Sequence, residues 1–381
     1  MKILVIVSSL GIGGIETTLL HCLRYFKDRN VEIHVLCRMG RVLDEEFKTM
    51  GAQIINIGKY KNPFCKALRL YTVLKRGNYE VVHSRDGFFS GLYALVCKLY
   101  SIPFIVSIHN CRVSSKLHWE DKLFLRLLKS FYLKTHRVLT ISLATKIVGH
   151  SKANLYYFTD NFENKSKYCV IYNGIDFSRL DSNQELDEDK QRQLYSFVRD
   201  SKLTFIHIGS FRVQKNHNLL IDIFNSLNPL LNNYKLILLG AGQLLNEIQQ
   251  KVFDLGIQTQ VYFVGLEINI FPYLKLSNLF IFPSIHEGFG NVLIEAQYAG
   301  IPVFASNIPP HYEAIYSNYH KYFFDPKDKM DALEKLKSLI EDINSTEIKQ
   351  DIEDAYRFAK QFSVKTMADN LSDLYESIIY S

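Results

Sequence analysis

A glycine-rich segment between two glutamates carries the residue types best suited to chemistry. It runs Glu287-Gly-Phe-Gly-Asn-Val-Leu-Ile-Glu295 and follows an apolar run, Leu279 to Phe282, which we expect to be a strand. Glycines that lead into a helix present unpaired backbone N–H groups at the positive end of the helix dipole, so this turn suits a phosphate. A carboxylate at each end could bind hydroxyl groups. The combination is typical of a nucleotide-sugar site.

Two cations follow another predicted strand. Gly209 ends that strand, and Arg212 and Lys215 come on the next loop. Cations beside a diphosphate neutralise the charge that develops on it as a glycosidic bond breaks. Each feature alone also has a structural interpretation, because a glutamate in a first helical turn complements the dipole and two cations on a loop can simply be solvated.

The first half of the chain offers further candidates. Gly13 and Gly14 follow the first predicted strand, where the missing Cβ atoms allow a ligand close to the backbone. Glu16 comes next, and could contact a ligand or cap a helix. His109 and Asn110 follow a later strand, although a single histidine after a core strand is often structural. The G-x-G-G spacing differs from G-x-G-x-x-G, which argues against a dehydrogenase.

Short apolar runs alternate with helical stretches along the whole chain, which predicts parallel sheets with helices on both faces. Ligands of such sheets bind beyond the carboxyl ends of the strands, where these motifs lie. A polar segment over residues 181–190 indicates a linker. The first set of predicted strands is Ile3–Val7, Glu32–Leu36, Gln53–Ile57, Val81–His83, Phe104–Ile108, Val138–Ile141 and Tyr168–Ile171. The second is Thr204–Ile208, Lys235–Leu239, Val261–Val264, Leu279–Phe282 and Val303–Ala305.

Composition fits a two-domain globular protein. With 381 residues, 47% of them hydrophobic, the chain can form two cores, and no apolar run approaches the roughly 18 residues that span a bilayer. The six cysteines form no C-x-x-C pair, which favours a reduced compartment and argues against a structural metal. Residues 1–180 carry 27 Lys and Arg against 13 Asp and Glu, whereas residues 181–381 carry 18 against 26. The two halves should therefore meet different partners, and no nucleic-acid module is visible.

Together these motifs resemble retaining family-four glycosyltransferases. The segment from Glu287 to Glu295 matches their E-x7-E signature, and the resemblance covers almost the whole chain. It implies an α/β GT-B fold with two doubly wound Rossmann-like domains facing each other across a cleft. Residues 1–180 would bind the acceptor, residues 181–360 the nucleotide-sugar donor, and a helix in residues 361–381 would cross back to the first domain. From the sequence alone, a terminal helix packed only on the second domain fits equally well. The other matching segments are Gly13 to Glu16, Ile108 to Asn110, Val170 to Asp176, Gly209 to Asn216 and Ala299 to Val303.

The resemblance also implies roles for single residues. Arg212 and Lys215 would bind the donor diphosphate, with Glu287 facing the sugar and Glu295 binding the ribose hydroxyls. His109 would act beside them in catalysis, and Glu16 and Asn110 would contact the acceptor. The remaining donor-binding positions are Gly13, Gly14, Gly209, Gly240, Gly288, Phe289, Gly290 and Asn291. A helix-start turn explains Gly240 as well as an approach of the base does, and Asn216 stands where relatives often have glycine.

The reaction implied is a retaining, metal-independent transfer of a hexose or N-acetylhexosamine from a nucleoside diphosphate, with UDP the favoured carrier. No Asp-x-Asp motif occurs where a magnesium–diphosphate clamp would need one, so we expect no metal and no cofactor besides the nucleotide-sugar substrate. In this mechanism the departing phosphate oxygen deprotonates the acceptor hydroxyl. A GT-B nucleotide-sugar epimerase and a non-catalytic GT-B partner subunit are the alternative functions.

A basic, aromatic stretch between Arg112 and Arg137 bears on the acceptor. Its predicted helix places Lys122, Arg126 and Lys129 on one face, which could rest on an anionic membrane surface. An ordinary amphipathic helix packed on its own domain is the alternative. The basic first half favours a cytoplasmic protein held peripherally on the inner face of the plasma membrane. Its acceptor would be a glycan on a polyprenyl diphosphate, used for bacterial exopolysaccharide, capsule or lipopolysaccharide.

Overall fold

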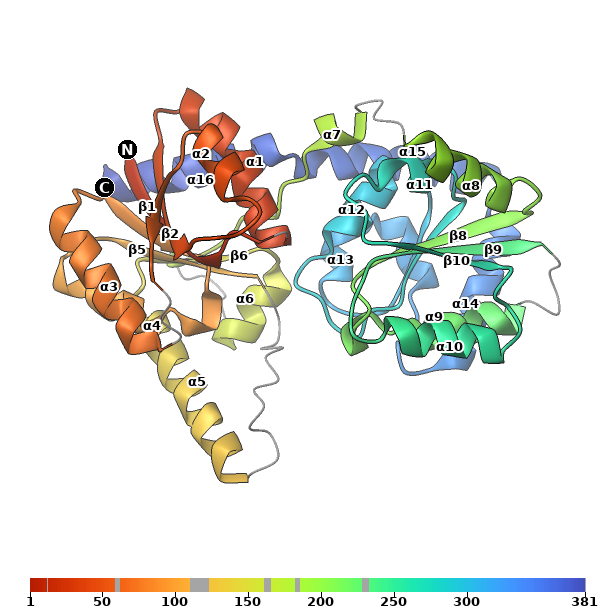
Figure 1. Cartoon of the computed structure of the whole chain (residues 1–381), viewed down its shortest axis with the longest axis horizontal. Coiled ribbons are helices and arrows are strands. Elements are labelled where there is room, and N and C mark those ends of the chain that lie inside the picture. The colour runs from red at the N-terminus through yellow and green to blue at the C-terminus, as the bar shows by residue number, and fades with distance from the viewer. Residues whose placement is uncertain are drawn as a thin grey trace. The chain divides into compact units, whose positions relative to one another are not determined.

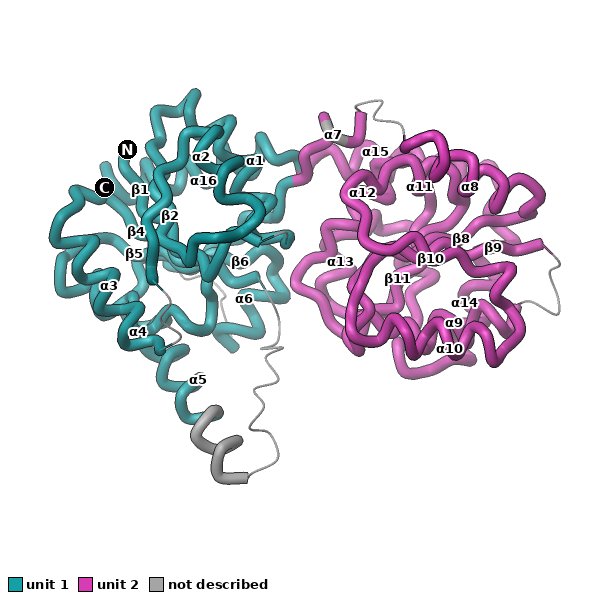
Figure 2. The backbone as a smooth tube through the Cα atoms, viewed as in Figure 1, with its two compact units in different colours: residues 1–174, 363–381 teal, residues 175–362 magenta. Residues whose placement is uncertain are grey.

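The computed structural model describes residues 1–11, 13–58, 62–109, 123–160, 166–181, 186–227 and 233–380. The chain forms two compact units (Figure 2). Unit 1 comprises Met1–Gly174 together with Ser363–Ser381, and unit 2 comprises Ile175–Phe362. The first boundary thus precedes residue 180, where the sequence placed it.

The segment before residue 181 belongs to unit 2 because its side chains pack there. Helix α7 (Phe177–Asp181) stacks the Phe177 ring on Tyr298, with 4.1 Å between ring centroids. The Tyr298 hydroxyl donates to the carboxylate of Asp181 at 2.9 Å. Part of the polar stretch expected as a linker instead begins a helix, α8 (Glu188–Val198), since the Asp187 side chain accepts a hydrogen bond from the Lys190 amide.

Unit 1 is built on a seven-stranded parallel sheet in the order β3-β2-β1-β4-β5-β6-β7. Strands β1, β2, β5 and β6 of this sheet are labelled in Figure 1. Its central strands are buried on both faces, because successive side chains of a strand point to opposite sides and each side has its own apolar cluster. The order reverses direction between β1 and β4, which is the switch point of a doubly wound fold. The strands are β1 (Lys2–Ser9), β2 (Glu32–Arg38), β3 (Gln53–Asn56), β4 (Val81–Ser84), β5 (Phe104–Ile108), β6 (Lys146–Gly149) and β7 (Tyr168–Val170).

Helices cover both faces of this sheet. One cluster packs residues of α1, α2 and α16 on the sheet, and the other packs residues of α3, α4 and α6. The predicted strand Val138–Ile141 is wrong, because these residues lie in the long helix α5, and the real strand β6 follows immediately after it. The helices are α1 (Gly14–Asp28), α2 (Asp44–Thr49), α3 (Pro63–Arg76), the 3-10 turn η1 (Gly87–Phe89), α4 (Gly91–Leu99), α5 (Leu123–Leu143), α6 (Lys152–Thr159) and α16 (Val364–Ile379).

The C-terminal helix α16 is part of the unit 1 core. Its buried face packs beside α1 with Val364, Met367, Leu371 and Tyr375. Ser363 caps the start of this helix, because its hydroxyl accepts a hydrogen bond from the Thr366 amide at 3.0 Å.

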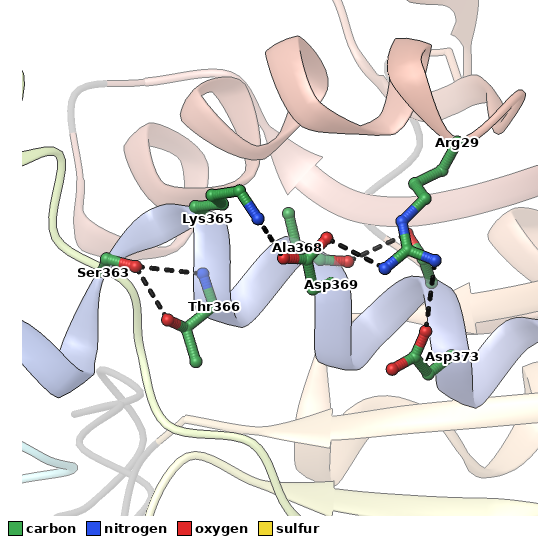
Figure 3. A network of polar contacts seen from close by, with 8 residues as sticks. Arg29, Ser363, Lys365, Thr366, Ala368, Asp369 and Asp373 are labelled. Atoms are coloured by element: carbon green, nitrogen blue, oxygen red, sulfur yellow. Dashed lines mark hydrogen bonds and ion pairs between the residues drawn. The ribbon is translucent and has the colours of Figure 1, made fainter.

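Charged contacts join the outer face of α16 to Arg29, the residue that follows α1 (Figure 3). Arg29 Nη2 lies 3.2 Å from Asp369 and its Nη1 lies 3.5 Å from Asp373. Lys365 approaches the same Asp369 carboxylate at 2.7 Å. The burial of apolar side chains therefore carries the docking of α16, with the exposed ion pairs at its edge adding little.

Unit 2 has a five-stranded parallel sheet in the order β10-β9-β8-β11-β12. The doubly wound topology predicted for both halves of the chain is confirmed. Within the described residues, no helix combines the length and the hydropathy needed to cross a bilayer. The strands are β8 (Leu203–Ile208), β9 (Tyr234–Leu239), β10 (Val261–Gly265), β11 (Leu279–Phe282) and β12 (Val303–Ala305). Besides α7 and α8, the helical elements are η2 (Val213–Lys215), α9 (His217–Leu227), α10 (Leu245–Asp254), α11 (Phe271–Lys275), α12 (Asn291–Tyr298), α13 (His311–Ala314), η4 (Ser317–Tyr322), α14 (Lys329–Asp342), α15 (Thr346–Ala359) and η5 (Lys360–Phe362).

Candidate active site

The carboxyl ends of β8 and β11 bring two of the predicted site residues together in unit 2. Lys215, on the turn after β8, places Nζ 2.8 Å from Oε1 of Glu287, which follows β11. The ammonium also lies 4.3 Å from the centroid of the Phe282 ring. Both side chains are largely buried, with 15% of Lys215 and 9% of Glu287 exposed. The pair is therefore a desolvated ion pair at the edge of the sheet.

Gln214 joins the same two loops and was missed by the sequence reasoning. Its Nε2 donates to the carbonyl of His286 at 2.8 Å and to Oε1 of Glu287 at 3.2 Å. The backbone carbonyl of Gln214 accepts a hydrogen bond from the Ile285 amide at 2.8 Å. Nothing in the sequence marks Gln214 except its place beside Lys215.

These partners keep Glu287 ionised. Burial acts to raise the pKa of Glu287, but the charge of Lys215 and the hydrogen bond from it outweigh burial, so the pKa lies below its ordinary value. His311 lies close enough to interact electrostatically, and burial lowers its own pKa to about 4. At neutral pH the site thus holds a carboxylate that accepts hydrogen bonds and is a poor proton acceptor.

The glycine turn before α12 has the backbone geometry expected at a helix start. Gly290 is the residue before the helix and has a φ of 99°, and a Cβ there would lie 2.7 Å from the Leu293 side chain. The side chain of Phe289 is only 2% exposed, with its ring 5.4 Å from that of Phe362. The predicted role of Phe289 toward phosphate can therefore fall only to its amide. Glu295 is half-buried on α12, and Gly288 and Asn291 flank the turn.

The loop after β8 carries the other predicted donor residues. Arg212 has an exposed side chain and precedes η2, so it shares one turn with Lys215. The backbones of Gly209 and Gly240 pack closely together, so that a Cβ on Gly240 would lie 2.1 Å from the Gly209 carbonyl oxygen. This close approach alone accounts for the glycine at 240, and a role toward the base stays a prediction.

Asn216 follows Lys215 in a left-handed backbone conformation. Its φ of 56° is left-handed, a conformation that asparagine adopts more readily than most residues other than glycine. The side-chain Nδ2 donates to the Pro326 carbonyl at 2.8 Å. Asn216 thus makes a left-handed turn that glycine could also make.

In unit 1, the predicted residues Gly13, Gly14 and Glu16 lie at the start of α1. Gly13 precedes the helix in extended backbone, and its carbonyl accepts from the Thr17 amide at 2.9 Å. The Glu16 carboxylate folds back over Gly13, where a Cβ would lie 2.7 Å from Oε2. Burial raises the pKa of Glu16. Glycine at 13 is therefore needed for this fold-back as much as for any ligand.

His109 lies after β5 and stacks on His150, which follows β6, with 4.1 Å between ring centroids. Burial, with the charges of His150 and Arg85, holds the pKa of His109 well below its ordinary value. The Nδ1 atom of His150 lies 2.8 Å from the Ile171 carbonyl, and burial lowers its pKa to about 3. Both rings are neutral at physiological pH. Asn110, predicted to contact the acceptor, lies outside the described residues, as do Arg112, Lys116, Trp119 and Lys122 of the basic stretch.

Arg85 completes this edge and was also missed. It follows β4, between β1 and β5 in the sheet, and is 3% exposed. The strand-end rule that selected His109 would have selected Arg85 as well. His83, two residues earlier, is fully bonded: Nδ1 lies 2.8 Å from the Tyr375 hydroxyl and Nε2 lies 2.8 Å from the Ser107 hydroxyl.

Two family models match the chain, one on each unit. Residues 12–179 match Glycosyltransferase Family 4, and residues 189–356 match Glycosyl transferases group 1. The capsular polysaccharide biosynthesis glycosyltransferase CapH of Staphylococcus aureus is 26% identical over 344 residues, covering 88% of each chain. The UDP-Gal:alpha-D-GlcNAc-diphosphoundecaprenol alpha-1,3-galactosyltransferase of Escherichia coli is 21% identical over 383 residues, covering 97% of this chain and 95% of that one.

Solved structures show the same fold. The Anabaena protein Alr3699/HepE, solved in complex with UDP, superposes with a TM-score of 0.79 at 19% identity and covers 99% of this chain and 100% of its own. Because the two family models account for most of the sequence and the fold extends over all of it, the chain belongs to glycosyltransferase family four and has the GT-B fold.

Proposed function

We propose that this protein transfers a hexose or N-acetylhexosamine from a UDP-sugar to a glycan acceptor in bacterial polysaccharide synthesis. The observation that carries the proposal is the buried Lys215–Glu287 pair beside the glycine turn of α12. It supplies a cation for a diphosphate and an ionised carboxylate for sugar hydroxyls within one site. The UDP complex of the Anabaena protein and the capsular role in the name of the S. aureus relative support the donor and the pathway.

Unit 2 would hold the donor. Arg212 and Lys215 take the diphosphate with the amides before α12, while Glu295 takes the ribose and Glu287 the transferred sugar. Glu287 is fixed by Lys215 and Gln214 and has a lowered pKa, so it suits a hydrogen-bond acceptor better than a base. This favours a retaining reaction in which the departing phosphate oxygen takes the acceptor proton, and in which protein cations rather than a metal balance the charge. The predicted catalytic role of His109 belongs to the same proposal.

Unit 1 would bind an acceptor carried on a polyprenyl diphosphate, as the name of the E. coli relative states for that enzyme. Its surface also suits a membrane. Helix α4 packs against α3 and α5, and large apolar side chains are exposed on all three: Phe64 (68%), Leu68 (65%), Leu99 (75%) and Phe131 (71%). With basic neighbours such as Lys98, this surface fits an anionic bilayer. If the protein fails to sediment with anionic liposomes at low salt, peripheral attachment at the inner face of the plasma membrane is wrong.

The donor is tested by thermal shift and calorimetry against UDP-glucose, UDP-galactose, their N-acetyl forms, GDP-mannose and UDP. We expect one UDP-sugar to stabilise the wild type and to lose this effect in Glu295→Ala. Glu334→Ala, an exposed change on α14 of the same unit, is the matched control and should bind normally. If no nucleotide binds, the proposed donor site is wrong, and the alternative function as a non-catalytic partner subunit is favoured.

The site assignment is tested by turnover. Glu287→Gln and Arg212→Ala should each reduce transfer strongly, and near wild-type rates in both variants would contradict the assignment. Incubation with the donor alone separates the reaction classes, because an epimerase converts a nucleotide sugar without any acceptor.

A further inference from the structure

Arg85 is a buried cation without a counter-ion among the described residues. Its side chain lies at the carboxyl edge of the unit 1 sheet, at the switch point between β1 and β4. Within the described part of the chain, neither Nε nor Nη2 has a hydrogen-bond partner. A buried guanidinium that lacks partners destabilises the fold, so its presence calls for an explanation.

Neighbouring carboxylates do not supply one. The Asp86 carboxylate accepts hydrogen bonds from the hydroxyls of Ser8 at 2.9 Å and Tyr93 at 3.4 Å, and no ion pair joins it to Arg85 in the described structure. Glu16 interacts with Arg85 electrostatically but folds over Gly13, and no ion pair joins the two in the described structure. Arg85 is therefore left with two donor nitrogens, Nε and Nη2, for a ligand.

The histidines beside Arg85 add complementary polar atoms. His150 Nδ1 lies against the Ile171 carbonyl and must carry its proton, so Nε2 offers a lone pair, and this atom has no partner in the described residues. Both ring nitrogens of His109 are likewise unpartnered there, which leaves one donor and one acceptor. Such atoms suit hydroxyl groups, whereas the fork of Nε and Nη2 suits two oxygens of an anion.

We infer that Arg85 binds the phosphate of a phosphorylated sugar ligand at the carboxyl edge of the unit 1 sheet, with His109 and His150 beside its hydroxyl groups. The source of that phosphate rests on the proposed function: the diphosphate of the acceptor is the favoured source, and the diphosphate of the donor is the other. Phosphate fits better than carboxylate because it has oxygens for the guanidinium fork and for the N–H of His109 at once.

The experiment compares wild type with Arg85→Met by thermal shift and calorimetry, using pyrophosphate added to protein saturated with UDP. UDP occupies the diphosphate site proposed in unit 2, so any further shift comes from another site. We expect pyrophosphate to raise the wild-type Tm further, and Arg85→Met to weaken its binding by about tenfold or more, since bidentate charged hydrogen bonds are lost. Without ligand, Arg85→Met should have the higher Tm, because an unpaired buried charge is replaced by an apolar chain of similar length.

A matched control is Arg29→Met, which removes a cation of the same unit that already has carboxylate partners. It should lower the Tm slightly and leave the pyrophosphate effect unchanged. Normal UDP binding by Arg85→Met would show that this variant is folded.

The responses of Arg85→Met to UDP and to pyrophosphate distinguish the two sources of the phosphate from a structural role of Arg85. If the UDP shift itself is lost in Arg85→Met, the bound phosphate is that of the donor; if only the pyrophosphate shift is lost, it is that of the acceptor. If pyrophosphate adds nothing to UDP-saturated wild type while Arg85→Met binds UDP normally, or if both proteins respond alike, the inference is overturned. A lower Tm of folded Arg85→Met with an unchanged ligand response would make Arg85 a structural residue. Failure of wild type to bind UDP would overturn the proposed donor instead, and pyrophosphate could still be tested on its own.

Discussion

The carboxyl edges of the two sheets differ in how a buried cation is neutralised. In unit 2, Lys215 has its counter-ion in Glu287, and Gln214 holds that carboxylate in place. In unit 1, Arg85 has no such partner in the described structure. Both edges end parallel strands of a doubly wound sheet, so topology alone does not decide the electrostatics. One edge balances its charge within the fold, and the other leaves charge to be balanced by a ligand.

The largest effect is expected from Lys215→Met. Loss of the ion pair leaves the Glu287 carboxylate buried without a cation, which should reduce the free energy of unfolding by about 3 kcal/mol. Transfer should fall by roughly 10²-fold or more, since a charge that stabilises the leaving diphosphate is gone. Urea denaturation measures the change in the free energy of unfolding, and initial rates measure the loss of transfer. The double variant Lys215→Met with Glu287→Gln should regain much of the stability and none of the activity. If Lys215→Met alone is as stable as wild type, the expected contrast with Arg85→Met is wrong.

Acid should destabilise both edges through their neutral histidines. Burial lowers the pKa of His217 in unit 2 to about 4, and that of His150 in unit 1 to about 3, from ordinary values of 6.5. Because the unfolded chain binds these protons first, stability falls as the pH drops below 6.5, down to about pH 4 for His217.

His217→Phe isolates this effect in unit 2. Its ring stacks on Phe211 at 4.0 Å between centroids, a contact that phenylalanine can keep. At pH 5 the variant should show about 2 kcal/mol less acid destabilisation than wild type, relative to pH 7.5. Thermal denaturation at both pH values measures it, and parallel acid profiles would show that His217 is already charged in the fold.

A smaller effect is expected from Tyr375→Phe in α16. The change removes the hydroxyl bonded to His83 and leaves Nδ1 of that buried ring without its partner. The free energy of unfolding should fall by about 1–2 kcal/mol. Tyr380→Phe, at a 78% exposed position of the same segment, should have no measurable effect. Equal stability of both variants would mean that the hydroxyl contributes nothing to docking.

The smallest effect is expected from Arg29→Ala, which removes the cation after α1 that pairs with the outer face of α16. The guanidinium is 40% exposed and Asp373 is 63% exposed, so the loss should be under about 1 kcal/mol. High salt should shrink the difference further, because it screens exposed pairs. A salt-independent loss larger than that of Tyr375→Phe would reverse the ranking of buried and exposed contacts.

The sequence predicted the fold because the alternation of strands and helices is local. It failed at Val138–Ile141, whose β-branched residues are typical of a strand but continue helix α5, and it missed the four-residue strand β6. Tertiary packing overrides propensity in such short segments. For α16, the spacing of Val364, Met367 and Leu371 predicts a helix but does not say which unit it packs against, since both units offer apolar surface.

The candidate site was predictable only where a motif marked it. The glycine turn and Lys215 are visible as patterns, and the structure places Lys215 against Glu287. The contribution of Gln214 depends on where two loops distant in the sequence meet, so no local pattern reveals it. Arg85 follows a strand just as His109 does, but its significance lies in the absence of a partner in the described structure, which the sequence alone cannot reveal.

The discontinuity of unit 1 has a consequence for synthesis. The buried face of α16, which includes Val364, Met367 and Tyr375, completes a core whose members outside that helix lie within the first 171 residues. A ribosome therefore finishes unit 2, which is continuous, before it delivers the helix that unit 1 needs. Until that helix emerges, the apolar surface that α16 covers beside α1 stays exposed and open to aggregation or to chaperones. A chain that stops before residue 363 should leave this apolar surface exposed. Cellular proteases can then recognise and degrade the truncated chain before it binds any substrate.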